Sequence, residues 1–244
     1  MTLKYFFANP AVVPKEYLWE AYGPEHICWL LLIAVFVTVS CVLFRKAAYD
    51  RQTKILRAFA LLIVVQEILK DILHWYAGTI TLEHLPFHIC GISIFFTLWH
   101  AYRPNGINSD YLYAVSMPGA LAALVVPNWT EYPILHFSAV NSFTIHTWLI
   151  AYAMMVLTSG RMRPDWRNLP KIAAIMIGLM IPIYFLNKRW GTNFMFINGA
   201  SPGSPLVPLY DIFADAYFIA AIFLIFVFWG VIYAPWIISD KKNS

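Results

Sequence analysis

The feature that most limits how this chain can fold is a series of seven apolar stretches. They lie near residues 27–44, 56–76, 86–102, 111–127, 138–158, 169–187 and 211–236. A helix that crosses the hydrocarbon core of a bilayer needs about 20 mostly apolar residues. Only 12% of the residues are charged, about half the share found in an ordinary soluble domain. The sequence therefore predicts an all-α fold, a polytopic membrane bundle of seven transmembrane helices.

The expected transmembrane domain, residues 25–238, leaves little chain outside it. Residues 1–24 are aromatic and punctuated by proline, without the clean apolar core of a signal peptide, so we expect them to lie at the membrane interface. Residues 239–244 form a short tail. The longest connection, 188–210, is rich in Gly, Asn, Ser and Pro. A loop of this length is unusual in a compact domain, and we expect it to form a lid or the rim of a pocket.

The fourth apolar stretch is interrupted by Pro118 and Gly119. Irregular backbone at membrane depth is tolerated only where protein covers it or where it lines a cavity. We therefore expect this part of the bundle to be enclosed by other helices.

Basic residues are distributed unequally between the alternate loops. Twelve lie on one side (Arg45, Lys46, Arg51, Lys54, Arg57, Arg103, Arg161, Arg163, Arg167, Lys171, Lys241, Lys242) and four on the other (Lys4, Lys15, Lys188, Arg189). Loops with excess Lys and Arg remain in the cytoplasm. This predicts an outside N-terminus and a cytoplasmic C-terminus, in a multi-pass protein of the cell membrane. The net charge of +4 forms no basic stripe interleaved with aromatic residues, so membrane lipids rather than nucleic acid are the expected partners. The oligomeric state is not specified by the sequence.

The second span carries an unusual concentration of polar side chains, Gln66, Glu67, Lys70, Asp71 and His74. At 100° per residue they all fall within an arc of about 140°, which must face the bundle interior rather than lipid. One interpretation is an internal ion-pair network in which the two carboxylates neutralise the lysine. The other is that these side chains belong to a functional site.

Six of the seven histidines fall in the outer half of the predicted bundle: His26, His74, His84, His88, His136 and His146. A single buried histidine is usually a packing residue, but six at one side favour a polar pocket that opens toward the outer face.

Cys90 follows Pro86 by about one helical turn, at the start of the third span. The positive end of a helix favours a thiolate, and a nearby base would activate the thiol further. His146 is the natural candidate, because eight residues at 1.5 Å rise place it about 12 Å deep from the same face. The alternatives are that Cys90 packs as a small hydrophobe or forms a disulfide with Cys28.

The outer end of the sixth span supplies compact hydrogen-bonding side chains, Asn187, Thr192 and Asn193. Any of them would suit a developing oxyanion. Lys188 and Arg189, in the same segment, either bind a lipid phosphate or are ordinary solvated caps.

A set of short motifs in this order resembles the YwaF family of bacterial integral membrane proteins, which is related to the animal transmembrane protein 164. The motifs are Glu-His at 25–26, Phe-His-Ile-Cys at 87–90, His146, and Gly-Thr-Asn-Phe at 191–194. The resemblance covers roughly residues 20–237 and agrees with the seven-span layout. It implies a phospholipid acyltransferase that moves an acyl chain between phospholipids without free coenzyme A or another cofactor. Cys90 would be the nucleophile and His146 its histidine partner.

Three hypotheses follow. The leading one is a Cys/His phospholipid acyltransferase or lipid acyl hydrolase, with Glu67, Lys70, Asp71, His74, His88, Asn187 and Asn193 as supporting or substrate-binding residues. The second is a metal-dependent intramembrane hydrolase with ligands from Asp71, His74, His88 and His146, although no HExxH-like pair is present. The third is a transporter or lipid-binding protein in which the polar stripe of the second span forms a path. The lack of an obvious internal repeat disfavours a transporter.

Overall fold

The computed structural model describes residues 5–8, 12–201, 204 and 206–242, and this part of the chain is 77% helical without a β-strand. The α-helices are α1 (Pro24–Lys46), α2 (Tyr49–Tyr76), α3 (Ile89–Tyr102), α4 (Gly106–Tyr111), α5 (Met117–Val125), α6 (Phe137–Thr158), α7 (Leu169–Trp190), α8 (Val207–Phe213) and α9 (Tyr217–Lys242). Short helical turns are η3 (Lys15–Tyr17), η4 (Leu82–His84), η6 (Trp166–Asn168), η7 (Phe194–Phe196) and η8 (Ala214–Ala216), and η5 (Leu112–Ser116) is a π-helical segment. The predicted all-helical fold is confirmed.

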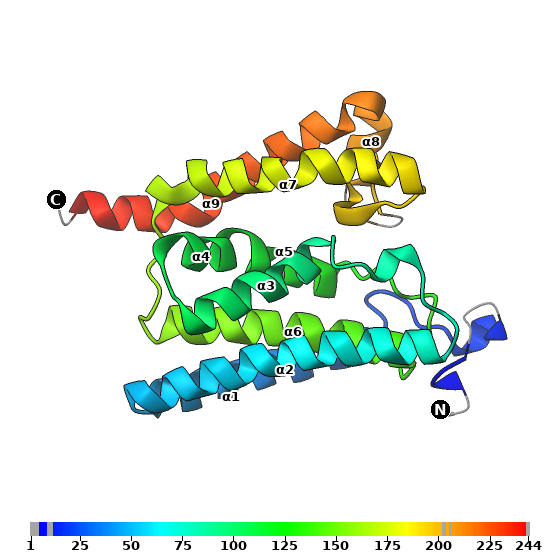
Figure 1. Cartoon of the computed structure of the whole chain (residues 1–244), viewed down its shortest axis with the longest axis horizontal. Helices are drawn as coiled ribbons and strands as arrows, with labels where there is room; N and C mark the ends of the chain where they lie inside the picture. Colours follow the sequence, from blue (N-terminus) through cyan, green and yellow to red (C-terminus); the bar gives the residue numbers. More distant parts are fainter. Residues whose placement is uncertain (1–4, 9–11, 202–203, 205, 243–244) are drawn as a thin grey trace.

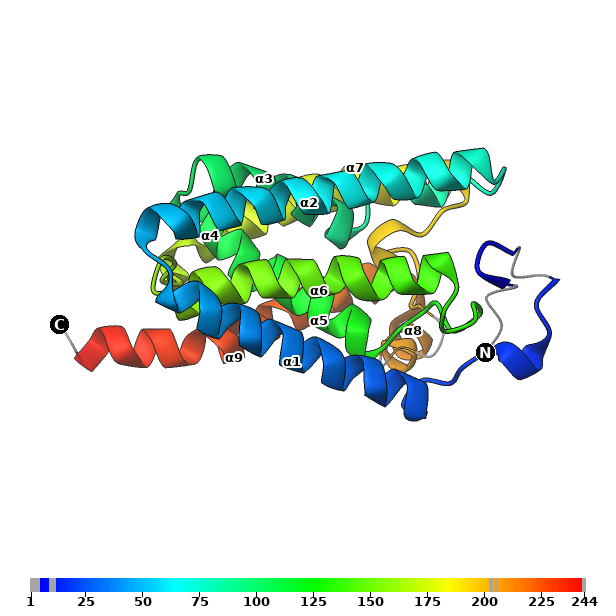
Figure 2. The same cartoon turned by 90° about the horizontal axis from the view of Figure 1, so that it is seen from below.

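The long helices lie roughly along one direction, with α6 at the centre (Figures 1 and 2). In the apolar stretch of α6, 61% of the residues are buried, against 22% in α1 and 17% in α9. The side chains that α1 and α9 leave exposed are large hydrophobics such as Leu31, Val35, Phe223 and Val231, as expected of helices that face lipid.

Among the residues that the structure describes, five helical segments are long and apolar enough to cross a membrane: 24–46, 82–102, 137–158, 166–190 and 217–240. The other two expected spans correspond to α2, which carries the charged stripe, and to the broken segment α4–η5–α5. The protein is thus an all-helical membrane protein with several apolar helices, and the count of seven spans and the orientation of the termini stay predictions.

The broken segment is enclosed by protein, as expected from its proline. Pro118 lies in the first turn of α5 and has no N–H to offer the carbonyl oxygen of Ala114, four residues earlier. That oxygen instead accepts a hydrogen bond of 2.9 Å from the indole N–H of Trp229 in α9. A side chain of a neighbouring helix therefore satisfies the backbone group that proline leaves free.

One end of the bundle, named here the Cys90 end, gathers the start of α1, α3 and α6 and the end of α2 and α7 (right-hand side of Figure 1). The described part of the N-terminal segment covers it. The Phe137 N–H donates to the Phe6 carbonyl at 2.8 Å, and Trp19 is buried against Phe143. Residues 1–4 and 9–11 of the predicted interfacial segment, and residues 243–244 of the tail, lie outside the described residues.

The opposite end of the bundle is held together by a buried carboxylate. Asp110 accepts hydrogen bonds from the Asp165 N–H, the Asn168 amide and the Tyr233 hydroxyl at 2.8–2.9 Å. Asp110 therefore ties α4 to η6 and α9.

Candidate functional site

Cys90 lies in the first turn of α3, where the chain changes from extended backbone to helix at His88. The approach to this turn is close: a Cβ atom at Gly91 would lie 2.8 Å from the Cα atom of Pro86. Only glycine fits there without moving the segment that leads to Cys90. The backbone N–H groups of residues 89–91 are at the helix N-terminus and have no carbonyl four residues back within the helix.

The structure places the Cys90 sulfur 2.9 Å from Nε2 of His146, across the interface of α3 and α6. Nδ1 of His146 lies 2.6 Å from the carbonyl oxygen of Ser142, which can only accept a hydrogen bond. Nδ1 therefore carries the proton, and Nε2 presents its lone pair to the thiol of Cys90. This is the geometry of a thiol beside a general base.

The imidazole ring of His146 is fixed by stacking as well as by hydrogen bonds. The indole of Trp129 lies parallel to it, with ring centroids 5.5 Å apart and an interplanar angle of 6°. Trp129 is itself buried and packs edge-on against Phe143, one turn before His146. A side chain from the loop before α6 thus holds the ring toward Cys90.

The charged stripe of α2 faces the bundle interior and forms a closed ion-pair group. The Lys70 ammonium lies 2.6 Å from Glu67 and 3.2 Å from Asp71. Glu67 also interacts electrostatically with Cys90. The carboxylates therefore neutralise Lys70 within α2.

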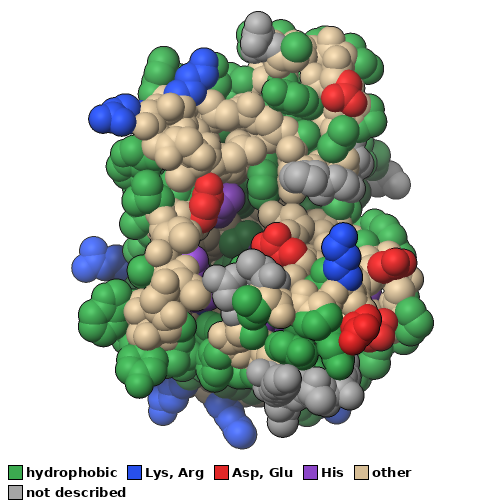
Figure 3. Space-filling view, turned by 90° about the vertical axis from the view of Figure 1, so that its right-hand side faces the viewer, with side chains coloured by type: hydrophobic (Ala, Val, Ile, Leu, Met, Phe, Trp, Pro, Cys, Tyr) green, Lys and Arg blue, Asp and Glu red, His purple; other side chains and the backbone are tan. Residues whose placement is uncertain are grey.

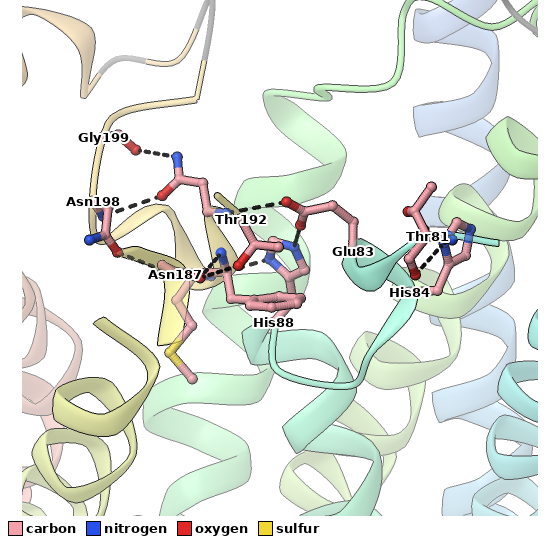
Figure 4. Close-up of polar contacts among 11 residues, drawn as sticks. Thr81, Glu83, His84, His88, Asn187, Thr192, Asn198 and Gly199 are labelled. Atoms are coloured by element: carbon pink, nitrogen blue, oxygen red, sulfur yellow. Dashed lines mark hydrogen bonds and ion pairs between the residues drawn. The ribbon is translucent and has the colours of Figure 1, made fainter. Parts of the chain in front are cut away.

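His88, two residues before Cys90, connects the start of α3 to the loop after α7 (Figure 4). Its Nδ1 accepts from the Met195 N–H at 3.3 Å, and its Nε2 lies 3.5 Å from a carboxylate oxygen of Glu83. The other oxygen of Glu83 accepts from the Asn193 N–H at 3.2 Å. Met195 and Phe196 both adopt left-handed backbone conformations, which are costly for residues other than glycine.

Asn187 organises this loop from its buried position at the end of α7 (Figure 4). Its amide donates to the Phe194 carbonyl at 3.0 Å and to the Asn198 side chain at 2.7 Å. Its side-chain oxygen accepts from the Thr192 hydroxyl and from the Phe194 N–H. The amide of Asn193 donates to the Gly199 carbonyl at 3.0 Å. The three side chains considered for an oxyanion site all take part in these bonds within the loop.

A cavity of about 530 Å³ opens at the Cys90 end, lined by residues that include His74, His84, His136 and Glu83. Figure 3 shows this end of the molecule, with histidine side chains inside a hollow and acidic side chains beside it. The rings of His74 and His84 lie 4.2 Å apart, and Nδ1 of His74 is 2.9 Å from the Thr79 hydroxyl.

His136 attaches the N-terminal segment to α6. Its Nδ1 accepts from the Ser138 N–H at 3.0 Å, so its Nε2 carries the proton that it donates to the Ala8 carbonyl at 2.9 Å. Burial lowers the pKa of His136. His136 therefore serves as a neutral clamp.

The structure thus brings Cys90 and His146 into contact and pairs Glu67 and Asp71 with Lys70 on α2. It places His74 at the cavity and joins His88, Asn187 and Asn193 to the loop after α7. Cys28 and Cys90 are both free thiols. Within the described residues, no group of three or more His, Cys, Asp or Glu is arranged to hold a metal ion. Sequence reasoning missed Trp129 and Glu83, because a tryptophan in a loop and a glutamate five residues before a histidine carry no recognisable signal.

Fold and site together define an all-helical membrane protein with a cysteine–histidine pair held between two of its helices. A model of the TMEM164 family matches residues 21–233, and the chain belongs to that family. The motifs that resembled this family therefore identified it correctly. Comparisons with curated proteins and with solved structures gave no match.

Proposed function

We propose that this protein transfers acyl chains from phospholipids through a thioester on Cys90, with His146 as general base and then general acid. The observation that carries the proposal is the 2.9 Å contact between the Cys90 sulfur and Nε2 of His146. The bond from Nδ1 to the Ser142 carbonyl adds to it, because it leaves Nε2 free to take a proton.

The reaction proceeds in two steps that balance. In the first, Nε2 of His146 takes the thiol proton, and the sulfur of Cys90 attacks the ester carbonyl carbon. The carbon–oxygen bond of the ester breaks, and the leaving alcohol receives the proton from His146. In the second, His146 takes a proton from the hydroxyl of an acceptor, whose oxygen attacks the carbonyl carbon of the thioester. The carbon–sulfur bond breaks, and His146 returns the proton to the sulfur of Cys90. A lysophospholipid as acceptor gives acyl transfer, and water gives hydrolysis.

The helix start supports this chemistry electrostatically. The backbone N–H groups in the first turn of α3 have no acceptor within the helix, and the positive end of this helix at Cys90 would stabilise negative charge on the carbonyl oxygen. They are backbone donors, so they need none of the side chains that the loop 188–210 already uses.

A lipid substrate suits the surroundings of the pair. Cys90 is only partly buried, and His146 is buried in an apolar bundle whose outer helices expose large hydrophobic side chains. The last turn of α7 carries Lys188 and Arg189 at the same end, where cations favour a phosphate group. A bilayer delivers such a substrate laterally, so the site needs no wide aqueous cleft.

The test uses purified protein in nanodiscs with a phospholipid labelled in its acyl chain and a lysophospholipid acceptor. We expect Cys90→Ala to abolish both transfer and a hydroxylamine-sensitive acyl adduct in the intact mass. His146→Ala should reduce transfer by about 10²- to 10⁴-fold, the range for loss of a general base.

The matched control is Cys28→Ser, which removes another free thiol from an exposed position in α1. It should transfer acyl chains within about twofold of the wild-type rate. Full activity of Cys90→Ala would refute the proposal, and labelled fatty acid in place of the labelled phospholipid product would identify a hydrolase.

A further inference from the structure

The carboxylate of Glu83 joins two segments that are far apart in the sequence, and it has no role in the chemistry above. One of its oxygens accepts a hydrogen bond from the Asn193 N–H at 3.2 Å, and the other lies 3.5 Å from Nε2 of His88. Asn193 belongs to the loop after α7, whereas His88 is the N-cap residue of α3, two positions before Cys90. Glu83 therefore links this loop to the chain that leads directly to the nucleophile (Figure 4).

The ring of His88 connects the carboxylate to the backbone of the loop. Its Nδ1 accepts from the Met195 N–H at 3.3 Å, so its Nε2 carries the proton and turns an N–H toward Glu83. The negative charge of Glu83 favours this tautomer, in which Nδ1 keeps the lone pair that the Met195 N–H needs. Glu83 and His88 therefore act as a pair on the same turn of the loop.

Aromatic packing reinforces these polar contacts. The His88 ring lies 5.3 Å from the ring of Phe194 and 5.4 Å from that of Phe196. Phe194 is fully buried and also packs edge-on against Phe87 at 5.4 Å. Apolar side chains therefore fill the junction between η7 and the residues that precede Cys90.

The turn η7 depends on these contacts because its backbone is strained. Met195 and Phe196 have φ angles of 57° and 53°, and such conformations persist in residues with side chains only where the surroundings hold them. Asn187 fixes the turn to α7 through its two bonds with Phe194. The Glu83–His88 pair fixes it to the start of α3.

We propose that Glu83 is a positioning residue, whose pair with His88 holds η7 against the start of α3 and keeps water from the acyl thioester on Cys90. This inference rests on the proposed function. The thioester carbonyl can be attacked by water or by the hydroxyl of a lysophospholipid, and His146 takes the proton in either case. The base therefore does not select the acceptor, and the selection depends on what surrounds the thioester.

Exclusion of water protects a reactive intermediate from hydrolysis. The turn η7 supplies an apolar wall on the segment that leads into Cys90, and Glu83 holds this wall in place from outside the reacting groups. The position of the turn thus favours transfer over hydrolysis.

The first experiment measures whether Glu83 holds the turn. Glu83→Ala removes both contacts of the carboxylate, and Glu83→Gln keeps the side-chain length and one acceptor oxygen. Amide hydrogen exchange of residues 192–198 should become at least about fivefold faster in Glu83→Ala, the factor for loss of one ordinary hydrogen bond, and Glu83→Gln should lie between it and wild type. Iodoacetamide, a water-soluble reagent, should alkylate Cys90 at least about twofold faster.

The matched control is Glu131→Ala, which removes the other glutamate that lines the cavity at this end. It should leave both the exchange and the alkylation rate unchanged.

The second experiment measures the fate of the acyl chain in nanodiscs, as the ratio of free fatty acid to acylated lysophospholipid. A defect of folding lowers both products together, whereas release of η7 should raise this ratio at least about fivefold in Glu83→Ala.

A wild-type exchange rate or a wild-type product ratio in Glu83→Ala would overturn this inference and leave the proposed function intact. Complete hydrolysis by the wild-type protein would overturn it too, because water would then reach the thioester freely. Full acyl transfer by Cys90→Ala would instead overturn the proposed function, and hydrogen exchange would still test whether Glu83 holds the turn.

Discussion

The side chain of Gln66 should stabilise the bundle by joining α2 to α6 within the membrane. Its amide nitrogen donates to the Asn141 side chain at 2.9 Å and to the Thr144 hydroxyl at 2.8 Å. Its carbonyl oxygen accepts from the Trp148 indole N–H at 2.7 Å. Replacement by methionine keeps an unbranched side chain of similar length and removes all three bonds.

The expected loss is about 2 kcal/mol of unfolding free energy. Hydrogen bonds between membrane helices contribute about 0.6 kcal/mol each on average and about 1.7 kcal/mol at most, and Gln66 makes three of 2.9 Å or shorter. Thr144 loses little in the variant because its hydroxyl still donates to the Val140 carbonyl. The Trp148 N–H loses the acceptor at the shortest of the three distances, so it should account for the largest share.

The assay is equilibrium unfolding in bicelles, measured by steric trapping, for Gln66→Met, Trp148→Phe and the double variant. Phenylalanine at 148 keeps an aromatic ring between Phe36 and Phe59, which pack edge-on against the indole. The double-mutant cycle should give a coupling energy of about 1 kcal/mol for the Gln66–Trp148 bond. A change below about 0.5 kcal/mol in Gln66→Met would refute the idea that this amide clamps the two helices.

Two further outcomes are expected. Gly91→Ala should destabilise the protein by about 1–3 kcal/mol, because the new methyl group overpacks the contact with Pro86. The displaced Pro86 should also slow alkylation of Cys90, and an unchanged alkylation rate would contradict this. The His136 clamp should hold above the ordinary histidine pKa of 6.5 and weaken as the pH falls below it, because protonation of Nδ1 removes the acceptor of the Ser138 N–H and burial lowers the pKa of His136 in the folded protein. Proteolysis of the N-terminal segment should accordingly rise between pH 7.5 and 5 in wild type and depend less on pH in His136→Gln; equal dependence would count against the clamp.

The helical architecture was accessible from sequence because its causes are local. Apolar length predicted the long helices, and the 100° repeat predicted which side of α2 turns inward: Gln66 and Lys70 are partly buried, whereas Val65 and Leu69 are exposed. The π-helical turn before Pro118 was not predictable, since it depends on a donor from Trp229, more than 100 residues away. Length and polarity alone also did not show that α8 separates from α9 near Ala214.

The location of the candidate site could be predicted from sequence better than the contacts between its side chains. Helix direction and depth placed Cys90 and His146 at the same level, but the direction of each side chain around its helix depends on packing that one sequence does not reveal. The same limit applies to Asn187. Its residue type suited an oxyanion donor, but the folded loop supplies four partners for it, and these come from residues that follow it within eleven positions.

Whether a buried polar group has a hydrogen-bond or ion-pair partner helps to identify where chemistry takes place. Inside a membrane, each polar group must find a partner within the protein, and Lys70, Gln66 and Asn187 all do so. Beside Cys90, the backbone N–H groups at the start of α3 have no carbonyl four residues back within the helix to accept their hydrogen bonds. Unused donors that surround a nucleophile are favourable only if a substrate completes them, and an ester carbonyl offers the acceptor that they lack.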